Sequence, residues 1–186
     1  MDFDKVIKNR HSVRRFKTMK HANWRDIIKA IDAANSAPLA GNIFTNKFIL
    51  VIDKEKINQL AEAAQQAFIA DADYVVVVCS DNKRLVTSYY ERGKKYAIQQ
   101  AAAAIENFLL KITDLGLASC WVGAFSDNSV RKILGIPDEI EVEAILPIGY
   151  EMGKANPPEK PNLDRILFFE RWKKKYMEPL KKPEAL

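Results

Sequence analysis

Glycine is scarce in this chain, and its scarcity excludes a class of protein. Only seven of the 186 residues are glycine. The sequence has no Gly-x-Gly-x-x-Gly motif and no phosphate-cradling loop ending in Lys-Ser or Lys-Thr, so the dedicated nucleotide-binding fingerprints are missing. If a nucleotide binds, side chains must therefore do most of the phosphate recognition.

Cysteine and histidine are scarcer still, with two of each in the chain. Cys79 and Cys120 lie in apolar, strand-like runs, which makes a disulfide framework or a metal site a poor interpretation. His11 and His21 are far apart and have little carboxylate company, so they do not suggest a metal centre either. We expect buried free thiols, a reducing compartment and no metal.

Long apolar runs and a strong charge imbalance are also absent. No run approaches the length of a membrane span, and the N-terminus begins with alternating charge rather than a signal peptide. The net charge of +5 is modest, and much of the excess lies at 171–182. Aromatic residues are not interleaved with the basic ones, as they are in single-strand binders. We expect a soluble, cytoplasmic protein that binds neither membranes nor nucleic acid.

What is present is an ordinary globular composition, 48% hydrophobic and 28% charged, in a chain long enough for one domain with a sizeable core. Strands do not alternate strictly with single helices, which favours an α+β fold with a central sheet over a doubly wound fold. Hydrophobic spacing and turn residues predict strands at 48–52, 74–79, 117–124 and 142–149, and helices at 2–9, 24–36, 54–69, 84–93, 96–115 and 128–134.

The helix predicted at 96–115 is apolar nearly all round at its centre. A helix of this kind is buried in a large core or in an interface. The stretch 151–162 is rich in proline and glycine and has no period, so it is expected to be a long connection or arm, and 163–175 shows some helical spacing. Both features suit a chain that packs against a partner.

The basic run Arg10-His11-Ser12-Val13-Arg14-Arg15-Phe16 is the clearest candidate site. Arginine presents a planar fork of donors that suits phosphate, and serine adds a compact hydroxyl donor. The run therefore predicts a grip on a phosphorylated ligand. The alternative is a solvated basic patch that closes a helix, where cations suit the C-terminal end of the dipole, and composition alone favours this alternative.

Several segments, taken in order, resemble the FMN-dependent nitroreductase family. They are the basic run at 10–16, Ala37-Pro38-Leu39-Ala40-Gly41-Asn42, 103–110, 115–125, 130–137, Leu146-Pro147-Ile148-Gly149-Tyr150 and Lys160-Pro161. The resemblance covers residues 3 to 170. It implies a nitroreductase-like α+β fold, with a central mixed or antiparallel sheet flanked by helices, in an intertwined homodimer with two FMN sites at the subunit interface. It also implies an FMN-binding domain at 1–170 and a basic C-terminal tail at 171–186.

The resemblance assigns five positions to the phosphate and ring of FMN. Arg10, His11 and Ser12 match positions that hold the phosphate and ribityl end. Arg14 matches a basic position on the N1 and C2-carbonyl side of the flavin, where a cation stabilises developing negative charge. Lys160 matches a late phosphate contact.

Three further positions match parts of the family that approach the flavin ring. Asn42 matches a loop position near the flavin. Gly123 and Ala124 match a turn whose backbone amide approaches flavin N5, and glycine permits such close approach. Taken without the resemblance, Gly123 is equally a turn glycine at the end of a strand.

The chain departs from the family at three places, one of which is Leu39, where a serine is common. After Asn42 the family often continues Ser-Gln-Pro-Trp, whereas this chain has Ile43-Phe44-Thr45-Asn46. Gln100 stands where an aspartate is frequent, and we expect Gln99 and Gln100 to be exposed or at the subunit interface. These departures put the detailed flavin contacts and the usual substrate in doubt.

The activity implied by the resemblance is a ping-pong reaction. NAD(P)H delivers hydride to flavin N5 and leaves, and a nitroaromatic, a quinone or a similar electron-poor acceptor is then reduced. The sequence demands no catalytic protein acid and does not choose between NADH and NADPH. The alternatives are other FMN chemistry on the same fold, of the dehydrogenase, dehalogenase or flavin-fragmenting type, and a flavin-binding protein without turnover.

Overall fold

The computed structural model describes residues 2–153 and 159–177, which form parts of two compact units, Met1–Ala155 and Asn156–Leu186. Within the second unit, the helical segment predicted at 163–175 is only a single turn, α7 (Leu163–Ile166), after which Phe168 and Trp172 pair with ring centroids 4.7 Å apart. Parts of the predicted arm (154–158) and tail (178–186) lie outside the described residues. The predicted domain limit at 170 stays a prediction.

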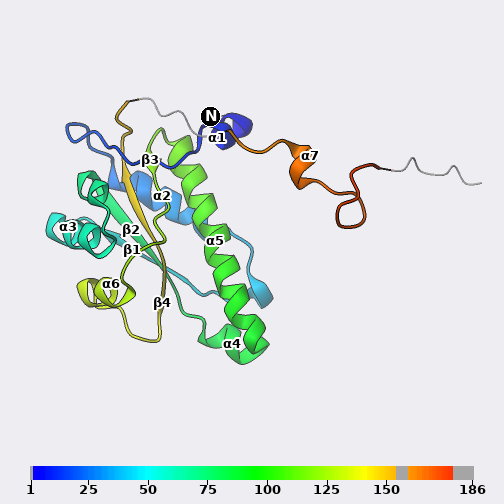
Figure 1. The fold of residues 1–186 in the computed structure, drawn as a ribbon. Coiled ribbons are helices and arrows are strands. Elements are labelled where there is room, and N and C mark those ends of the chain that lie inside the picture. The colour runs from blue at the N-terminus through cyan, green and yellow to red at the C-terminus, as the bar shows by residue number, and fades with distance from the viewer. Residues whose placement is uncertain (1, 154–158, 178–186) are drawn as a thin grey trace, which may run out of the picture. The chain divides into compact units, whose positions relative to one another are not determined.

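The first unit is built on a four-stranded sheet in the order β1-β2-β4-β3, with every neighbouring pair antiparallel (Figure 1). The strands are β1 (Asn46–Val51), β2 (Tyr74–Ser80), β3 (Ala118–Ser119) and β4 (Glu141–Gly149). The predicted α+β class is confirmed. The strand predicted at 117–124 was too long, because beyond Ser119 only Val122 returns to the sheet, through an isolated bridge to Ile145.

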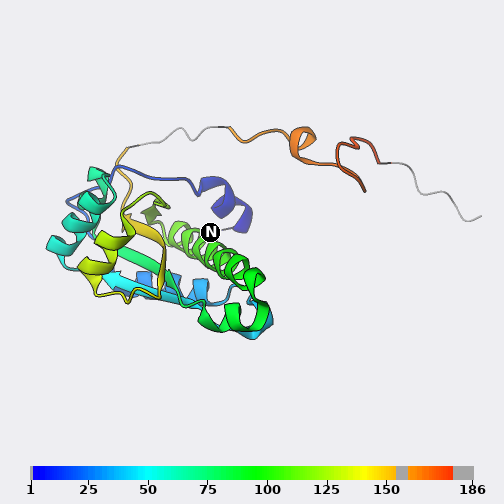
Figure 2. The same ribbon diagram turned by 60° about the horizontal axis from the view of Figure 1, so that its bottom comes forward.

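Helices cover both faces of this sheet (Figures 1 and 2). Alternate side chains of β2 point to opposite faces, as the pleat requires. Val76 and Val78 pack with α2 (Trp24–Asn35) and α5 (Glu91–Asp114). Val75 and Val77 pack with α3 (Lys54–Ala63) and α6 (Asp127–Leu134). A strand buried on both faces reads as an unbroken apolar run, which is why β2 was predictable.

The helix ends show where local conformation overrides hydrophobic spacing. The predicted helix at 54–69 ends at Ala63, because Gln65 takes a left-handed conformation (φ 52°), and a 3₁₀ segment follows at Ala67–Asp71. α1 (Phe3–Asn9) and the Asn23 cap of α2 agree with prediction. α4 (Lys83–Tyr89) and α5 are separated by Tyr90 alone, so α5 begins before the predicted residue.

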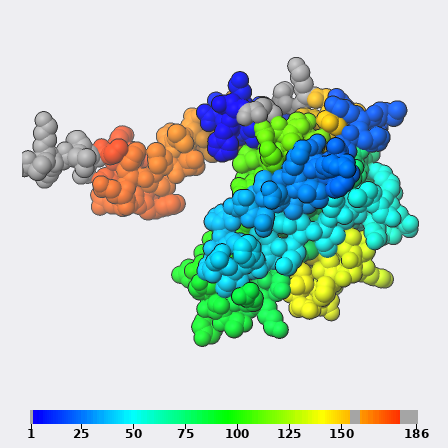
Figure 3. Space-filling model, turned by 180° about the vertical axis from the view of Figure 1, so that it is seen from behind, coloured from blue at the N-terminus to red at the C-terminus, as the bar shows by residue number. Residues whose placement is uncertain are grey.

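The long helix α5 has one face buried in the core and another face exposed. Its inward residues, among them Ala104 and Phe108, are fully buried under the sheet, whereas Ile98 is 60% exposed. Figure 3 views the molecule from behind and shows α2 (blue) lying across the side of the first unit that is turned toward the viewer. Among the described residues, none of the helices has the length and apolarity to cross a membrane.

Candidate functional site

The basic run is held as a rigid connection across the ends of β3 and β4. The Val13 amide donates to the Ser119 carbonyl at 3.0 Å, and the Arg15 carbonyl accepts from the Met152 amide at 2.9 Å. Val13 and Phe16 are buried, 4% and 2% exposed. Because backbone and side chains both anchor this segment, the polar residues between the anchors are displayed in fixed positions.

Ser12 and Arg14 are the displayed residues, and both side chains are exposed. They lie beside Cys120, whose thiol donates to the Trp121 carbonyl at 3.9 Å and whose pKa both of them influence. Burial raises the pKa of the Cys120 thiol, although the Arg14 charge and the Ser12 hydrogen bond act in the opposite direction. Cys120 is therefore a neutral, buried thiol, as its core interpretation predicted, and not a nucleophile.

Arg10 and His11 are engaged by carboxylates from elements far along the chain. Arg10 Nε lies 3.2 Å from Glu106 Oε1 on α5. His11 Nε2 lies 3.0 Å from Glu151 Oε1, and its Nδ1 lies 2.7 Å from the Asn9 carbonyl. Burial lowers the pKa of His11, but the Asn9 carbonyl and the Glu151 carboxylate outweigh it, so the pKa is raised above its usual value.

A buried polar atom without a partner lies next to this segment. Ser119 is 5% exposed, and within the described residues its Oγ has no hydrogen-bond partner. Its carbonyl is the one that accepts from Val13. A buried hydroxyl left unpaired costs about 1–3 kcal/mol, so each such atom needs an explanation, and a bound group beside Ser119 would supply one.

The turn that carries Gly123 and Ala124 starts three residues after Cys120 and is anchored at both ends. Val122 bridges to β4, and the Ser126 amide donates to the Ala63 carbonyl at 2.9 Å. Both Gly123 and Ala124 are exposed.

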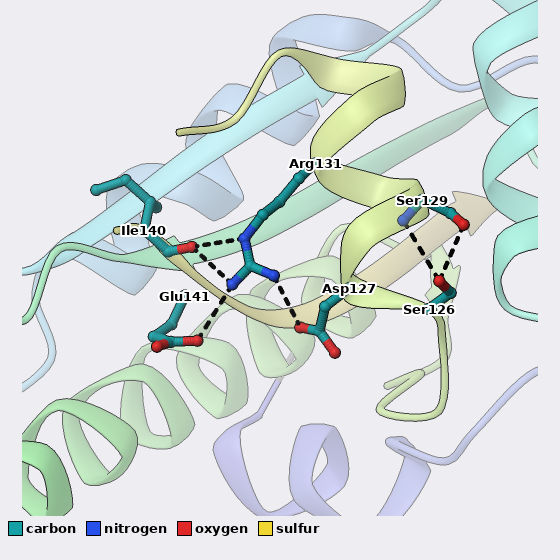
Figure 4. A network of polar contacts seen from close by, with 6 residues as sticks. All are labelled: Ser126, Asp127, Ser129, Arg131, Ile140 and Glu141. Carbon is teal, nitrogen blue, oxygen red and sulfur yellow. Dashed lines mark hydrogen bonds and ion pairs between the residues drawn. The ribbon is translucent and has the colours of Figure 1, made fainter. Parts of the chain in front are cut away.

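Beyond the turn, α6 is fixed to the start of β4 (Figure 4). Ser126 caps α6 by accepting from the Ser129 amide at 3.3 Å. Arg131 donates to the Ile140 carbonyl at 3.1 and 3.2 Å and reaches Glu141 at 3.3 Å. The turn at 123–124 is therefore an exposed loop between two rigid supports.

Gly123 is the one glycine of the chain that no feature of the described residues requires. Four of the other six have a φ between 57° and 90°, where side chains are strained. At the remaining two, Gly93 and Gly149, an added Cβ would come within 2.3 Å of Leu85 and 3.1 Å of Phe16. At Gly123, an added Cβ meets no atom within 4 Å. The space beside Gly123 thus suits a molecule that is not part of the chain.

Asn42 belongs to a second location. It ends a 3₁₀ turn, Ala40–Asn42, and is exposed. Gln100 holds this loop to α5: its Oε1 accepts from the Ala40 amide at 2.7 Å, and its Nε2 donates to the Ile43 carbonyl at 3.2 Å and to Thr45 Oγ1 at 3.0 Å. Gln100 is 4% exposed, so the prediction that it is exposed or at an interface was wrong.

The predicted site residues therefore fall into separate groups. Arg10, His11, Ser12 and Arg14 lie together beside Ser119 and Cys120, and the 123–124 turn follows in the chain. Along α5, Gln100 and Glu106 are six residues apart, about 9 Å of rise and about 120° around the axis. Lys160 is exposed and lies in the second unit.

Four residues of these locations were not predicted as contributors: Glu106, Ser119, Glu151 and the clamping Gln100. Their partners are distant in sequence, 140 positions in the case of Glu151. Glu106 and Glu151 carry no local motif, so no signal in the chain marked them.

Comparisons with known proteins agree on one family. The pattern of the Nitroreductase family matches residues 7–150. A protein of Archaeoglobus fulgidus named as an NADH dehydrogenase/NAD(P)H nitroreductase is 33% identical over 151 residues, 78% of this chain and 83% of its own length.

Two solved structures extend the likeness to the fold. A nitroreductase family protein from Clostridium difficile 630 is 30% identical, with a TM-score of 0.81 over 92% of this chain and 100% of its own. An FMN-dependent nitroreductase from Clostridium difficile R20291 is 26% identical, with a TM-score of 0.76 over 90% of this chain and 98% of its own.

Proposed function

Because the chain belongs to the nitroreductase family, we propose that it is an FMN-dependent oxidoreductase that uses NAD(P)H to reduce electron-poor acceptors such as nitroaromatics or quinones. The FMN-dependent relative and the relative named for NADH and NAD(P)H support the cofactor and the co-substrate. The observation that carries the proposal is Gly123, a glycine with no internal explanation at the turn expected to face flavin N5.

The residues present fit FMN. Ser12 and Arg14 offer a hydroxyl and a guanidinium on a rigid segment, and the unpartnered Ser119 hydroxyl lies beside it. The ion pair of Arg10 uses Nε, and the terminal nitrogens carry four more N–H donors. We assign Arg10, Ser12 and Arg14 to the phosphate and ring of FMN, the 123–124 turn to N5, and His11, Asn42 and Lys160 to supporting positions.

When bound, FMN supplies the hydride transfer at N5, and the protein supplies position and electrostatics. Arg14 holds a fixed positive charge where negative charge develops on the ring. Ser12 donates its hydroxyl to the phosphate end, and Glu106 fixes the guanidinium of Arg10. The backbone of the exposed 123–124 turn would approach the ring. No described side chain is asked to act as a proton donor.

We further propose a cytoplasmic homodimer with the flavin site at the subunit interface. The Asn42 loop and the basic run lie at different places along and around α5, so a second subunit offers a way to bring the two together. Ile98 on α5 and Phe44 beside the Asn42 loop are 60% and 57% exposed, which suits an interface. We also propose residues 1–170 as the FMN-binding domain, followed by a basic tail at 171–186.

The absorption spectrum of the purified protein tests the cofactor. We expect the peaks of oxidised flavin, with FMN as the released pigment, and oxidation of NADH or NADPH that depends on menadione or nitrofurazone. Flavin without reduction by either nicotinamide would favour a binding protein, and a colourless protein that takes up no added FMN would refute the proposal.

A matched pair of arginine substitutions tests the site. Arg14→Gln removes a charge-assisted contact of about 1.5–3 kcal/mol, so FMN should bind about tenfold to a hundredfold more weakly. Arg15 is its exposed neighbour without an assigned contact, and Arg15→Gln should retain wild-type flavin content. Equal losses in both variants would show that general charge, and not Arg14, holds the cofactor.

A further inference from the structure

His11 is placed so that both of its ring nitrogens face acceptors. Nδ1 lies 2.7 Å from the Asn9 carbonyl, and Nε2 lies 3.0 Å from Glu151 Oε1. A neutral imidazole carries one N–H, whereas the imidazolium carries two. With Glu151 as a carboxylate, both hydrogen bonds exist together only when His11 is protonated, and no ring N–H is then left for a phosphate.

We propose that His11 is a positioning residue and not a phosphate ligand: as an imidazolium clamped between Asn9 and Glu151, it fastens the flavin-binding segment to the end of β4 and releases it on losing a proton. The inference rests on the proposed function for the identity of the ligand, and on the geometry alone for the clamp itself.

The clamp holds the basic run ahead of Val13, whereas the backbone contacts to β3 and to Glu151 lie at Val13 and Phe16. Phe16 bridges to Glu151, and Val13 donates to Ser119. Ahead of Val13, the His11 side chain is the link between the segment and β4. Its loss would leave the side before Ser12 held through Arg10 and its ion pair with Glu106, so Ser12 would have a larger range of positions to lose on binding.

The charges around His11 set the direction of the pH effect. Glu151, at the end of β4, favours the protonated ring, and Arg10, at the end of α1 and paired with Glu106 of α5, opposes it. The pKa is raised above 6.5 in the folded protein. The clamp is therefore complete below pH 6.5 and is lost as the pH rises through the raised value.

Proton NMR of the flavin-free protein tests the clamp without the cofactor. The chain has two histidines, and a His21→Gln variant assigns their ring signals. We expect His11 to titrate above 6.5, and Glu151→Met, which removes charge and acceptor, to raise its acid dissociation constant about tenfold. Glu151→Gln keeps an acceptor and should restore part of the difference. An unchanged titration in Glu151→Met would overturn the inference.

Flavin affinity then separates a clamp from a direct ligand. Riboflavin lacks the phosphate, so the ratio of riboflavin to FMN dissociation constants isolates the phosphate contribution. At about pH 5.5, below the usual histidine pKa, Glu151→Met should reduce this ratio about fivefold or more if His11 is a clamp. If His11 contacts the phosphate directly, removing the nearby Glu151 carboxylate should instead increase the ratio, which would refute the clamp.

The pH profile completes the test. The phosphate itself titrates near pH 6 in any variant, so wild type is compared with His11→Gln at each pH. We expect the wild-type advantage over His11→Gln to disappear as the pH rises past the raised pKa of His11, where its imidazole is neutral. His21→Gln is the matched control, because His21 also meets a carboxylate, Asp73, but is 76% exposed. Parallel wild-type and His11→Gln profiles would contradict the inference, whereas failure to bind either flavin would refute the proposed function and leave the NMR result standing.

Discussion

Replacing Gln100 by alanine should destabilise the protein far more than its place in a helix suggests. The side chain makes three hydrogen bonds to the loop before β1 and is 4% exposed. One of its partners, Thr45, is fully buried. At about 1 kcal/mol net for each bond, the substitution costs about 3 kcal/mol. A protein of this size loses about 2–4 °C of melting temperature per kcal/mol, so we expect a fall of about 6–12 °C.

The assay is thermal unfolding at fixed protein concentration and flavin loading, because oligomerisation and ligands both shift the melting temperature. Gln99→Ala is the matched control: the same change, one residue earlier on α5, at an exposed side chain. Alanine is at least as good a helix former as glutamine, so this control should melt at or slightly above the wild-type temperature.

Gln100→Glu sharpens the reasoning, because it keeps the shape of the side chain. One carboxylate oxygen can still accept from Ala40, but the other replaces the amide that donates to the Ile43 carbonyl. At neutral pH the variant should be as unstable as Gln100→Ala, and it should recover stability as the pH falls and the buried carboxyl takes up a proton. If Gln100→Ala melts within about 2 °C of Gln99→Ala, the loop clamp contributes little and this account of the loop fails.

Two further predictions follow from glycine packing and from buried thiols. Gly123→Ala should weaken FMN binding about tenfold or more, while the flavin-free protein keeps its melting temperature. Gly93→Ala should lower the melting temperature strongly, because its Cβ would come within 2.3 Å of Leu85. Equal effects of the two substitutions on stability would refute the ligand explanation for Gly123. Cys79 and Cys120 should both resist a thiol reagent at neutral pH until the protein unfolds. Burial, with help from the Glu143 charge, raises the pKa of Cys79 from 9.0 to about 11, so the stability that this thiol contributes is present below pH 9.0 and declines as the pH rises toward 11. Reaction of the folded protein at the unfolded rate would contradict the burial.

The predictable part of the fold was the part set by short-range pattern. β2 reads as an unbroken apolar run because both of its faces are covered, and Asn23 begins α2 because its side chain accepts from the Arg25 amide. The errors came where long-range pairing decides. In the apolar run at 117–124, Cys120 and Val122 are buried while Gly123 and Ala124 are exposed, but burial does not require strand pairing, and most of the run is not strand.

The basic run at 10–16 is a candidate site because of the family resemblance, since its residue types alone favoured a solvated patch. Its internal division was not predictable from the sequence. The contrast between an exposed Arg14 and a His11 clamped by Glu151 depends on a contact across 140 positions. Gln100 illustrates the same limit: its polarity suggested exposure, and only the loop packed against α5 supplied the partners that allow it to be buried.

By itself the sequence determined the α+β class and most of the helices, because these follow from hydrophobic period and local capping. It determined the family and the residue types at the candidate flavin site through the resemblance of several segments in order. The tertiary structure alone decided that Arg10 and His11 are paired with carboxylates, and that within the described residues no atom lies within 4 Å of a Cβ added at Gly123. These features depend on contacts between residues that lie far apart in the sequence, and local sequence patterns do not specify such contacts.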